Sequence, residues 1–257
     1  MGNKYLQYNN KFAGWNGNPM QIDVPGGGGS YPTDGLTHYW GIDETSGTDI
    51  ADSVGSFNGT LYNGSLNASG KNEYCLSWNS AANSAIRMGD VLSVEKATTY
   101  STSLWWKLDT ASDPGEGFLI GKAMSSSPYK GWIYHFSWST HIYWDIFASS
   151  GSNQQRIAAD DNLTGDTDWH HFVATYDGTD ATGMLMYIDG TLADTTISTN
   201  NLSDSTYNSA AQFTIGNRTT SSSAFKGRID EVGYWNRVLT SDEVATLWND
   251  GDGLFYS

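Results

Sequence analysis

The segment that decides the fold covers residues 225–251 and reads FKGRIDEVGYWNRVLTSDEVATLWNDG. Its first part, residues 225–235, alternates in character, which is typical of a β-strand whose two faces meet different environments. One face is predicted to carry Phe225, Gly227, Ile229, Glu231, Gly233 and Trp235. The other face is predicted to carry Lys226, Arg228, Asp230, Val232 and Tyr234.

A short helix is predicted directly after this strand. Thr240 is a favourable N-cap, and Glu243 three residues later completes a capping box. Leu239 and Val244 occupy the two positions of a hydrophobic staple, and Gly251 is placed to end the helix. One helical face carries Val244, Leu247 and Trp248. A strand, a sharp corner and one docked helix therefore close the chain.

Four segments of the sequence carry recognisable motifs in order. Residues 35–59 contain Tyr-Trp, Asp-Glu-Thr-Ser-Gly, Asp-Ser and Asn-Gly, residues 168–178 read DWHHFVATYDG, and residues 186–190 read MYIDG. The fourth is Phe-x-Gly-x-Ile-Asp-Glu-Val followed by Trp-Asn-Arg-x-Leu-Thr, within residues 225–240. Together they resemble laminin-G-like (concanavalin A-like) jelly-roll domains of the laminin G type 3 kind, over roughly residues 35–253.

The composition agrees with one large β domain. A chain of 257 residues with 11 Trp, 15 Tyr, 9 Phe and 29 Gly suits a sandwich of short strands separated by many turns. We therefore expect an all-β, antiparallel two-sheet jelly roll with one short C-terminal helix and an extended N-terminal arm. The expected domain occupies residues 35–257, after a Gly-rich linker at 26–34 and the arm at 1–25.

The arm is too aromatic for a solvated tail and too short for a core of its own. Tyr5, Tyr8, Phe12 and Trp15 are therefore expected to contact another chain, such as another subunit of a virion or surface assembly. A homo-oligomer is left open. The N-terminal segment has no apolar run, so neither a secretory signal nor a membrane span is predicted.

The net charge of −15 argues against two classes of partner. An acidic surface of this size repels nucleic acid and anionic membranes, so neither is expected to bind directly. The single cysteine, Cys75, excludes an intrachain disulfide and is expected to be a small buried side chain.

The sequence favours a protein without catalytic activity. His170 and His171 are neighbours on a predicted strand, so their side chains point to opposite faces and cannot share one metal ion. Related laminarinase-type enzymes carry Glu-x-Asp-x-x-Glu on one strand, and no Glu-x-Asp occurs in this chain.

An aromatic hairpin is the candidate ligand surface. Its first strand places Trp132, Tyr134 and Trp138 on one face, and its second strand places Tyr143 and Trp144 on opposite faces. Such a face more often belongs to the core of a sandwich. Exposed aromatic rings beside polar side chains, however, are how proteins stack sugars.

A structural calcium ion is implied by the resemblance. Related jelly rolls tie the first loop to the last strand through such an ion, and the matching positions are Asp52 and Asp230. Carbonyl groups and waters would have to complete the six to eight oxygen ligands that calcium requires. The alternative is that Asp230 pairs with Arg228 or caps a turn.

The expected function is that of a non-enzymatic structural or adhesive module on a phage, other virion or extracellular surface, binding a glycan or a protein. One alternative is a carbohydrate-binding module of a larger secreted protein. A second is a glycoside hydrolase or lyase with an unrecognised site. The host assignment rests on fold analogy, which does not by itself establish function.

Overall fold

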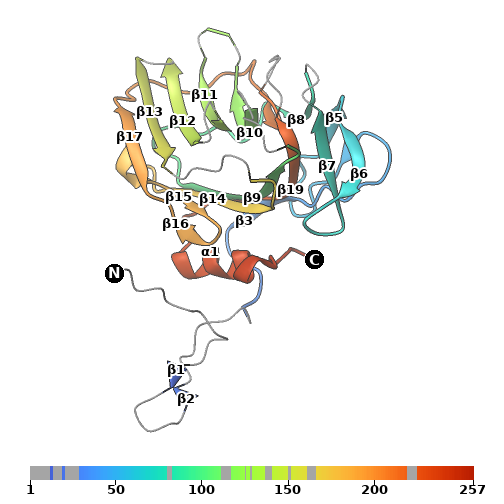
Figure 1. Cartoon of the computed structure of the whole chain (residues 1–257). Helices are drawn as coiled ribbons and strands as arrows, with labels where there is room; N and C mark the ends of the chain where they lie inside the picture. Colours follow the sequence, from blue (N-terminus) through green and yellow to red (C-terminus); the bar gives the residue numbers. More distant parts are fainter. Residues whose placement is uncertain are drawn as a thin grey trace.

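The computed structural model shows two antiparallel sheets packed face to face (Figure 1). It describes residues 12–13, 19–20, 29–79, 83–110, 117–124, 126–127, 129–136, 141–149, 152–160, 166–218 and 225–257. The expected all-β sandwich with one short C-terminal helix is confirmed.

The first sheet has nine strands, and we call it the nine-stranded sheet. In spatial order its strands are β17 (Thr195–Asn200), β13 (Asn153–Ala159), β12 (Ile142–Ser149), β11 (Gly131–Phe136), β10 (Gly117–Ala123), β18 (Phe213–Ile215), β8 (Ala85–Gly89), β5 (Gly59–Tyr62) and β4 (Asp49–Ile50). The predicted aromatic hairpin is its β11–β12 pair, in which Tyr134 lies opposite Trp144.

The second sheet, the eight-stranded sheet, contains the strand that opens the deciding segment. Its order is β16 (Thr191–Leu192), β15 (Met184–Ile188), β14 (His170–Tyr176), β9 (Tyr100–Leu108), β19 (Lys226–Trp235), β7 (Tyr74–Asn79) and β6 (Ser65–Ser69), with β3 (Leu36–Trp40) also paired to β19.

The main core fills the space between the two sheets. Leu104 and Trp106 of β9 join it, whereas Trp105 between them faces outward and stacks on Trp248, with ring centroids 5.3 Å apart. His170 packs on Trp106 and His171 on Trp105, so the predicted opposite orientation of the two histidines is confirmed. Strict alternation therefore holds along β9 and at the start of β14.

Alternation fails in β19, where the prediction of two uniform faces is wrong. Phe225 and Ile229 enter the main core as predicted, but Val232 also enters it, and Trp235 joins a different cluster outside the sheet. The physical reason is a β-bulge between Asp230 and Gly233, at which Glu231 adopts a left-handed φ of 55°. One extra residue in a strand exchanges the faces of every side chain beyond it.

The helix α1 (Ser241–Trp248) lies against the outer face of the eight-stranded sheet (Figure 1). The predicted capping box between Thr240 and Glu243 is present. Val244 and Leu247 are buried in the same outer cluster as Leu239, which agrees with the predicted staple, while Trp248 is half-buried. The helix ends at Asn249, whose φ of 49° is left-handed, rather than at Gly251.

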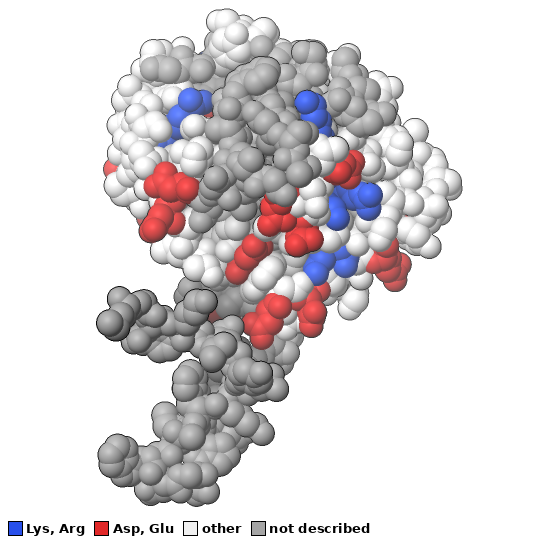
Figure 2. Space-filling model, viewed as in Figure 1, with Lys and Arg blue, Asp and Glu red and all other residues white. Residues whose placement is uncertain are grey.

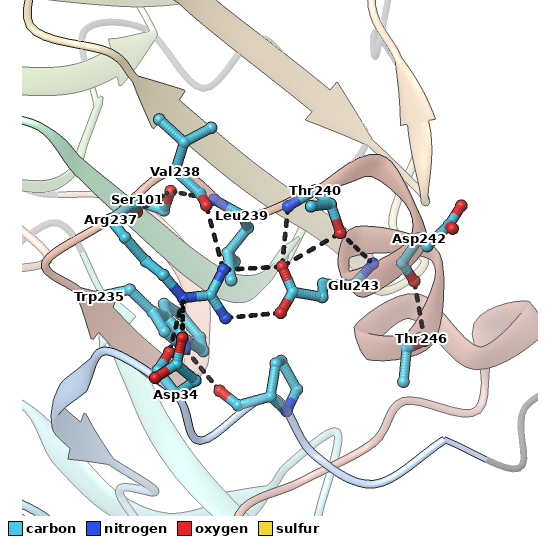
Figure 3. Close-up of polar contacts among 11 residues, drawn as sticks. Asp34, Ser101, Trp235, Arg237, Val238, Leu239, Thr240, Asp242, Glu243 and Thr246 are labelled. Atoms are coloured by element: carbon cyan, nitrogen blue, oxygen red, sulfur yellow. Dashed lines mark hydrogen bonds and ion pairs between the residues drawn. The ribbon is translucent and has the colours of Figure 1, made fainter.

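Residues 31–34, placed by composition in the linker, contact the domain instead. Tyr31 stacks on Trp235, and the Trp235 indole N–H donates to the Pro32 carbonyl at 2.7 Å (Figure 3). A short antiparallel pair, β1 (Phe12–Ala13) with β2 (Pro19–Met20), forms within the predicted arm. Tyr5, Tyr8 and Trp15 lie outside the described residues, as does the side chain of Phe12, so their predicted role stays a prediction.

The surface reflects the acidic composition. Figure 2 shows Asp and Glu side chains spread over the lower part of the domain, with Lys and Arg side chains interspersed. In the part of the chain that the structure describes, no helix has the length and apolar character needed to cross a membrane.

Candidate functional site

A small, shallow depression lies where four segments of the nine-stranded sheet and its loops meet. These segments are the end of β10, the start of β11, the loop after β8 and the loop before β18. The side chains that matter for its chemistry are those of Ser93, Lys122, Thr206, Tyr207 and Asn208. We call this feature the Tyr207 depression.

Tyr207 presents the exposed aromatic ring of the depression. It is 49% exposed, and its hydroxyl donates a hydrogen bond to Asp90 Oδ2 at 2.9 Å. The Lys122 ammonium lies 5.0 Å from the ring centroid. The ring is therefore held in place at its hydroxyl and by a cation while much of the residue stays open to solvent.

Lys122 starts from the core side of β10, because its register partners Trp132 and Phe213 are both core residues. Its long side chain reaches from there to the loop after β8. The ammonium donates to Asp90 Oδ1 at 2.5 Å and to Ser93 Oγ at 2.6 Å. The Lys122 side chain is only 3% exposed, against 38% for that of Asp90, so the carboxylate is the charged group that faces solvent.

Glu95 orders the loop that carries Tyr207. Its carboxylate accepts from the Ser205 hydroxyl at 2.8 Å and from the backbone N–H groups of Thr206 and Tyr207, both at 3.0 Å. The Thr206 hydroxyl also donates to the Val94 carbonyl. Fixing the loop in advance lowers the entropy cost of binding a ligand there.

Tyr207 and the neighbouring Asp90, which are both exposed, keep their usual protonation states at neutral pH. Hydrogen bonds from Lys122 and then from Tyr207 lower the pKa of the Asp90 carboxyl. The hydrogen bond to Asp90 raises the pKa of the Tyr207 phenol above its ordinary value. Asp90 does not line the depression, but Lys122 and Tyr207, which do, hold its carboxylate beside it as an acceptor next to a neutral aromatic ring.

The aromatic hairpin does not form the predicted ligand surface. Trp132, Tyr134 and Trp144 are each 0% exposed and belong to the core between the sheets. Their side chains fill the sandwich because both strands lie in the middle of the nine-stranded sheet, so the core interpretation is the right one for these three residues. Trp138 lies outside the described residues.

Tyr143, the fifth candidate, is half-buried on the outer face of the nine-stranded sheet. It stacks on His135 at 5.6 Å between ring centroids, and the Arg156 guanidinium lies 5.5 Å from its ring. Beside it the buried Asp145 accepts from His135 Nε2 at 2.8 Å and from Arg156 Nε at 2.5 Å. Burial raises the pKa of Asp145, but the hydrogen bonds from Arg156 and His135 outweigh it, and the net pKa lies below the ordinary value.

The two predicted calcium ligands bind different partners. Both Asp52 oxygens already accept hydrogen bonds, among them one from Gly55 N at 2.8 Å, and Oδ2 lies 2.6 Å from His38 Nδ1. Asp230 Oδ2 accepts from the backbone N–H of Lys71 at 2.8 Å and thus caps a turn.

Two buried oxygens of β19 fit a cation better than Asp52 does. Asp230 Oδ1 and Glu231 Oε2 are buried and have no hydrogen-bond partner among the described residues, so both oxygens are available as ligands of the kind that calcium prefers. Burial raises the pKa of both carboxyls, that of Glu231 to about 8. No group of three or more His, Cys, Asp or Glu within the described ranges could hold a metal. Calcium therefore stays a prediction.

Sequence reasoning missed Asp90, Lys122 and Tyr207. The available signal was a single aromatic residue within the polar run Ser-Thr-Tyr-Asn at 205–208, because an isolated aromatic in a polar loop has no local core to join. The partners lie 85 and 117 residues away in sequence from Tyr207, so no local pattern joins the three.

Solved structures share this fold at low sequence identity. The binding domain of Paraclostridial Mosquitocidal Protein 1 matches with a TM-score of 0.65 and 16% identity, over 85% of this chain and 53% of that one. Trypanosoma rangeli sialidase, in complex with a difluorinated nononic acid, matches with a TM-score of 0.60 and 15% identity, over 90% and 35%. This chain therefore spans about half of the first protein and a third of the second.

A third structure is matched over nearly its whole length. Domain 4 of AbnA, an extracellular GH43 arabinanase from Geobacillus stearothermophilus, in complex with arabinotriose, has a TM-score of 0.53 and 21% identity, over 82% of this chain and 96% of that one. No curated protein matches the chain. Residues 79–245, more than half of the chain, match the family described as the Concanavalin A-like lectin/glucanases superfamily. With its two packed antiparallel sheets and this match, the chain belongs to the concanavalin A-like lectin/glucanase superfamily.

Proposed function

We propose that this protein is a non-enzymatic glycan-binding module of a virion or other extracellular surface, and that it binds a sugar at the Tyr207 depression. One observation carries the proposal: a half-exposed aromatic ring is fixed beside a solvent-facing carboxylate and neutral polar side chains. A sugar ring offers apolar C–H groups to such an aromatic face and hydroxyl groups to such acceptors.

The similar structures support a glycan as the ligand. The arabinanase domain is described in complex with arabinotriose, and the sialidase in complex with a nononic acid derivative. The mosquitocidal protein contributes a binding domain of the same fold. These relatives share the fold at 21% identity or less. The kind of sugar that this chain binds therefore has to be inferred from its own side chains.

Attachment to a larger assembly is the second part of the proposal. The aromatic arm at residues 1–25 is the segment that would supply it, since it carries several large apolar side chains ahead of a Gly-rich run. A glycan-binding domain held by such an arm would present its depression to a surface while the arm is fixed elsewhere.

A glycan array on the purified protein tests the binding function. Tyr207→Ala should lower the affinity for any glycan that the array detects by at least about tenfold, which corresponds to about 1.4 kcal/mol of binding free energy. Tyr62→Ala is the matched control, because Tyr62 is 43% exposed on the nine-stranded sheet with Arg87 over its ring, away from the depression. Equal affinity of both variants and the wild type would place the ligand elsewhere. Release of sugar from a bound polysaccharide would overturn the non-enzymatic assignment.

A further inference from the structure

We infer that the Tyr207 depression selects the uncharged end of a glycan, a neutral hexose or pentose, and discriminates against sugars that carry a carboxylate or sulfate. This inference rests on the proposed function, because it names the class of sugar that the same site takes. It follows from how Lys122, which lines the depression, is already paired with the neighbouring Asp90.

Among the residues that the structure describes, Lys122 is the cation that lines the depression, and its ammonium is already engaged by partners within the protein. An ammonium group has three N–H donors. Two of those of Lys122 go to Asp90 Oδ1 and Ser93 Oγ, and the ammonium lies 5.0 Å from the Tyr207 ring centroid. Its side chain is also 3% exposed, so a bound carboxylate could neither reach the charge nor replace its partner without moving Asp90.

The charged group that meets solvent is an acceptor. Each Asp90 oxygen accepts one hydrogen bond, from Lys122 or from Tyr207, and an ionised carboxylate offers about four acceptor positions. The remaining positions belong to a side chain that is 38% exposed. They suit the hydroxyl donors of a neutral sugar and repel a second carboxylate brought to the same place.

The surrounding charges do not reverse this preference. Lys130, which directly precedes β11, is a further cation, and its ammonium donates to the Ser205 carbonyl at 3.1 Å; Lys130 is not part of the lining of the depression. Glu95 adds another carboxylate beneath the loop that carries Tyr207. The remaining polar side chains of the lining, Ser93, Thr206 and Asn208, are uncharged, and the whole chain carries −15.

Matched pairs of methyl glycosides test the inference. Methyl β-glucoside and methyl β-galactoside differ from methyl β-glucuronide and methyl β-galacturonide only in a hydroxymethyl group in place of a carboxylate. Affinities are measured by ligand-observed NMR titration at low salt and at 1 M salt. The neutral member of a pair should bind at least about tenfold more tightly at low salt, and the ratio should shrink at 1 M salt, where the screening length falls to about 3 Å.

Two variants assign the discrimination to Asp90. Asp90→Asn should bring the ratio of the affinities for the neutral and the acidic sugar close to one. Asp90→Asn combined with Lys122→Met should have the same effect, and this double variant leaves no unpaired ammonium. A uronide that binds the wild type as tightly as its neutral partner would overturn the inference and leave the glycan-binding function standing. If neither member of any pair binds, or if Tyr207→Ala leaves binding unchanged, the proposed site fails as well. The salt dependence of the wild type decides the question even if both variants fold poorly.

Discussion

Glu243 joins three local structures at the C-terminal corner, so its removal tests how the deciding segment closes the fold (Figure 3). Its carboxylate accepts from the Thr240 backbone N–H at 2.8 Å and completes the capping box of α1. It also forms a two-pronged ion pair with Arg237, with contacts of 2.8 Å and 2.5 Å. Arg237 in turn donates to the Asp34 carbonyl at 2.8 Å, which ties the start of the domain to the helix.

The expected cost of Glu243→Ala follows from these contacts. Loss of a helix cap costs about 1 kcal/mol, and a partly exposed ion pair contributes up to about 1 kcal/mol. We therefore expect a loss of about 1–2 kcal/mol, which lowers Tm by about 2–8 °C in a domain of this size. Because the Glu243 side chain is 28% exposed, solvent screens its ion pair with Arg237. We therefore expect the total loss to lie nearer to about 1 kcal/mol than to about 2 kcal/mol.

The same residue predicts a pH dependence. The hydrogen bond from Arg237, opposed by partial burial and assisted by Thr240, lowers the pKa of Glu243 to about 2, against 4.5 for the free side chain. A carboxyl with a lowered pKa in the folded state stabilises fully above its unfolded pKa. Its contribution should therefore be complete above about pH 4.5 and should disappear as the pH falls toward 2.

Urea unfolding of the wild type, Glu243→Ala and Asp242→Ala at pH 7 and pH 3 measures both effects. Asp242 is the matched control, since it is an exposed carboxylate in the same helical turn and shares the favourable interaction with the helix dipole, worth about 0.3–1 kcal/mol. A double-mutant cycle with Arg237→Met should give a coupling energy of about 0.2–1 kcal/mol at pH 7. A coupling energy of zero, or equal losses in the two single variants, would refute this account of the corner.

Four further predictions concern the helix, the core, the metal and the arm. Leu247→Ala should cost about 2–5 kcal/mol in urea unfolding because Leu247 is 2% exposed, and a neutral result would mean that α1 does not dock. Burial lowers the pKa of His171 to about 3, so the stability of the fold should decline as the pH falls from about 6.5 toward 3. In melting curves recorded over that pH range, His171→Gln should make the decline smaller. If Asp230 holds calcium, a chelator should lower Tm, and calcium at a hundredfold excess over its Kd should restore about 2.7 kcal/mol in the wild type but not in Asp230→Asn; an unchanged curve with no metal in the protein would exclude the ion. Removal of residues 1–30 should leave Tm nearly unchanged and abolish assembly or particle attachment, whereas unfolding of the truncated protein would make the arm part of the core.

The fold follows from the sequence wherever the signal is local. Alternation places Trp106 inside and Trp105 outside, and the capping box at Thr240 fixes the start of α1, because each depends on residues a few positions apart. The bulge at Glu231 has no such local signal. It exchanges the faces of Val232 and Trp235 because one residue of β19 has no partner on β9, and that follows from pairing between distant strands.

The candidate site also separates what local sequence predicts from what contacts between distant segments decide. The sequence by itself determined a sandwich rich in aromatic residues, a non-basic surface and a capped C-terminal helix, since composition and short-range periodicity carry that information. Only the tertiary structure decided which aromatic rings are exposed. Trp132 and Trp144 are covered by the opposite sheet, whereas Tyr207 meets solvent beside Asp90 and Lys122, because burial and the convergence of loops depend on contacts between segments far apart in the chain.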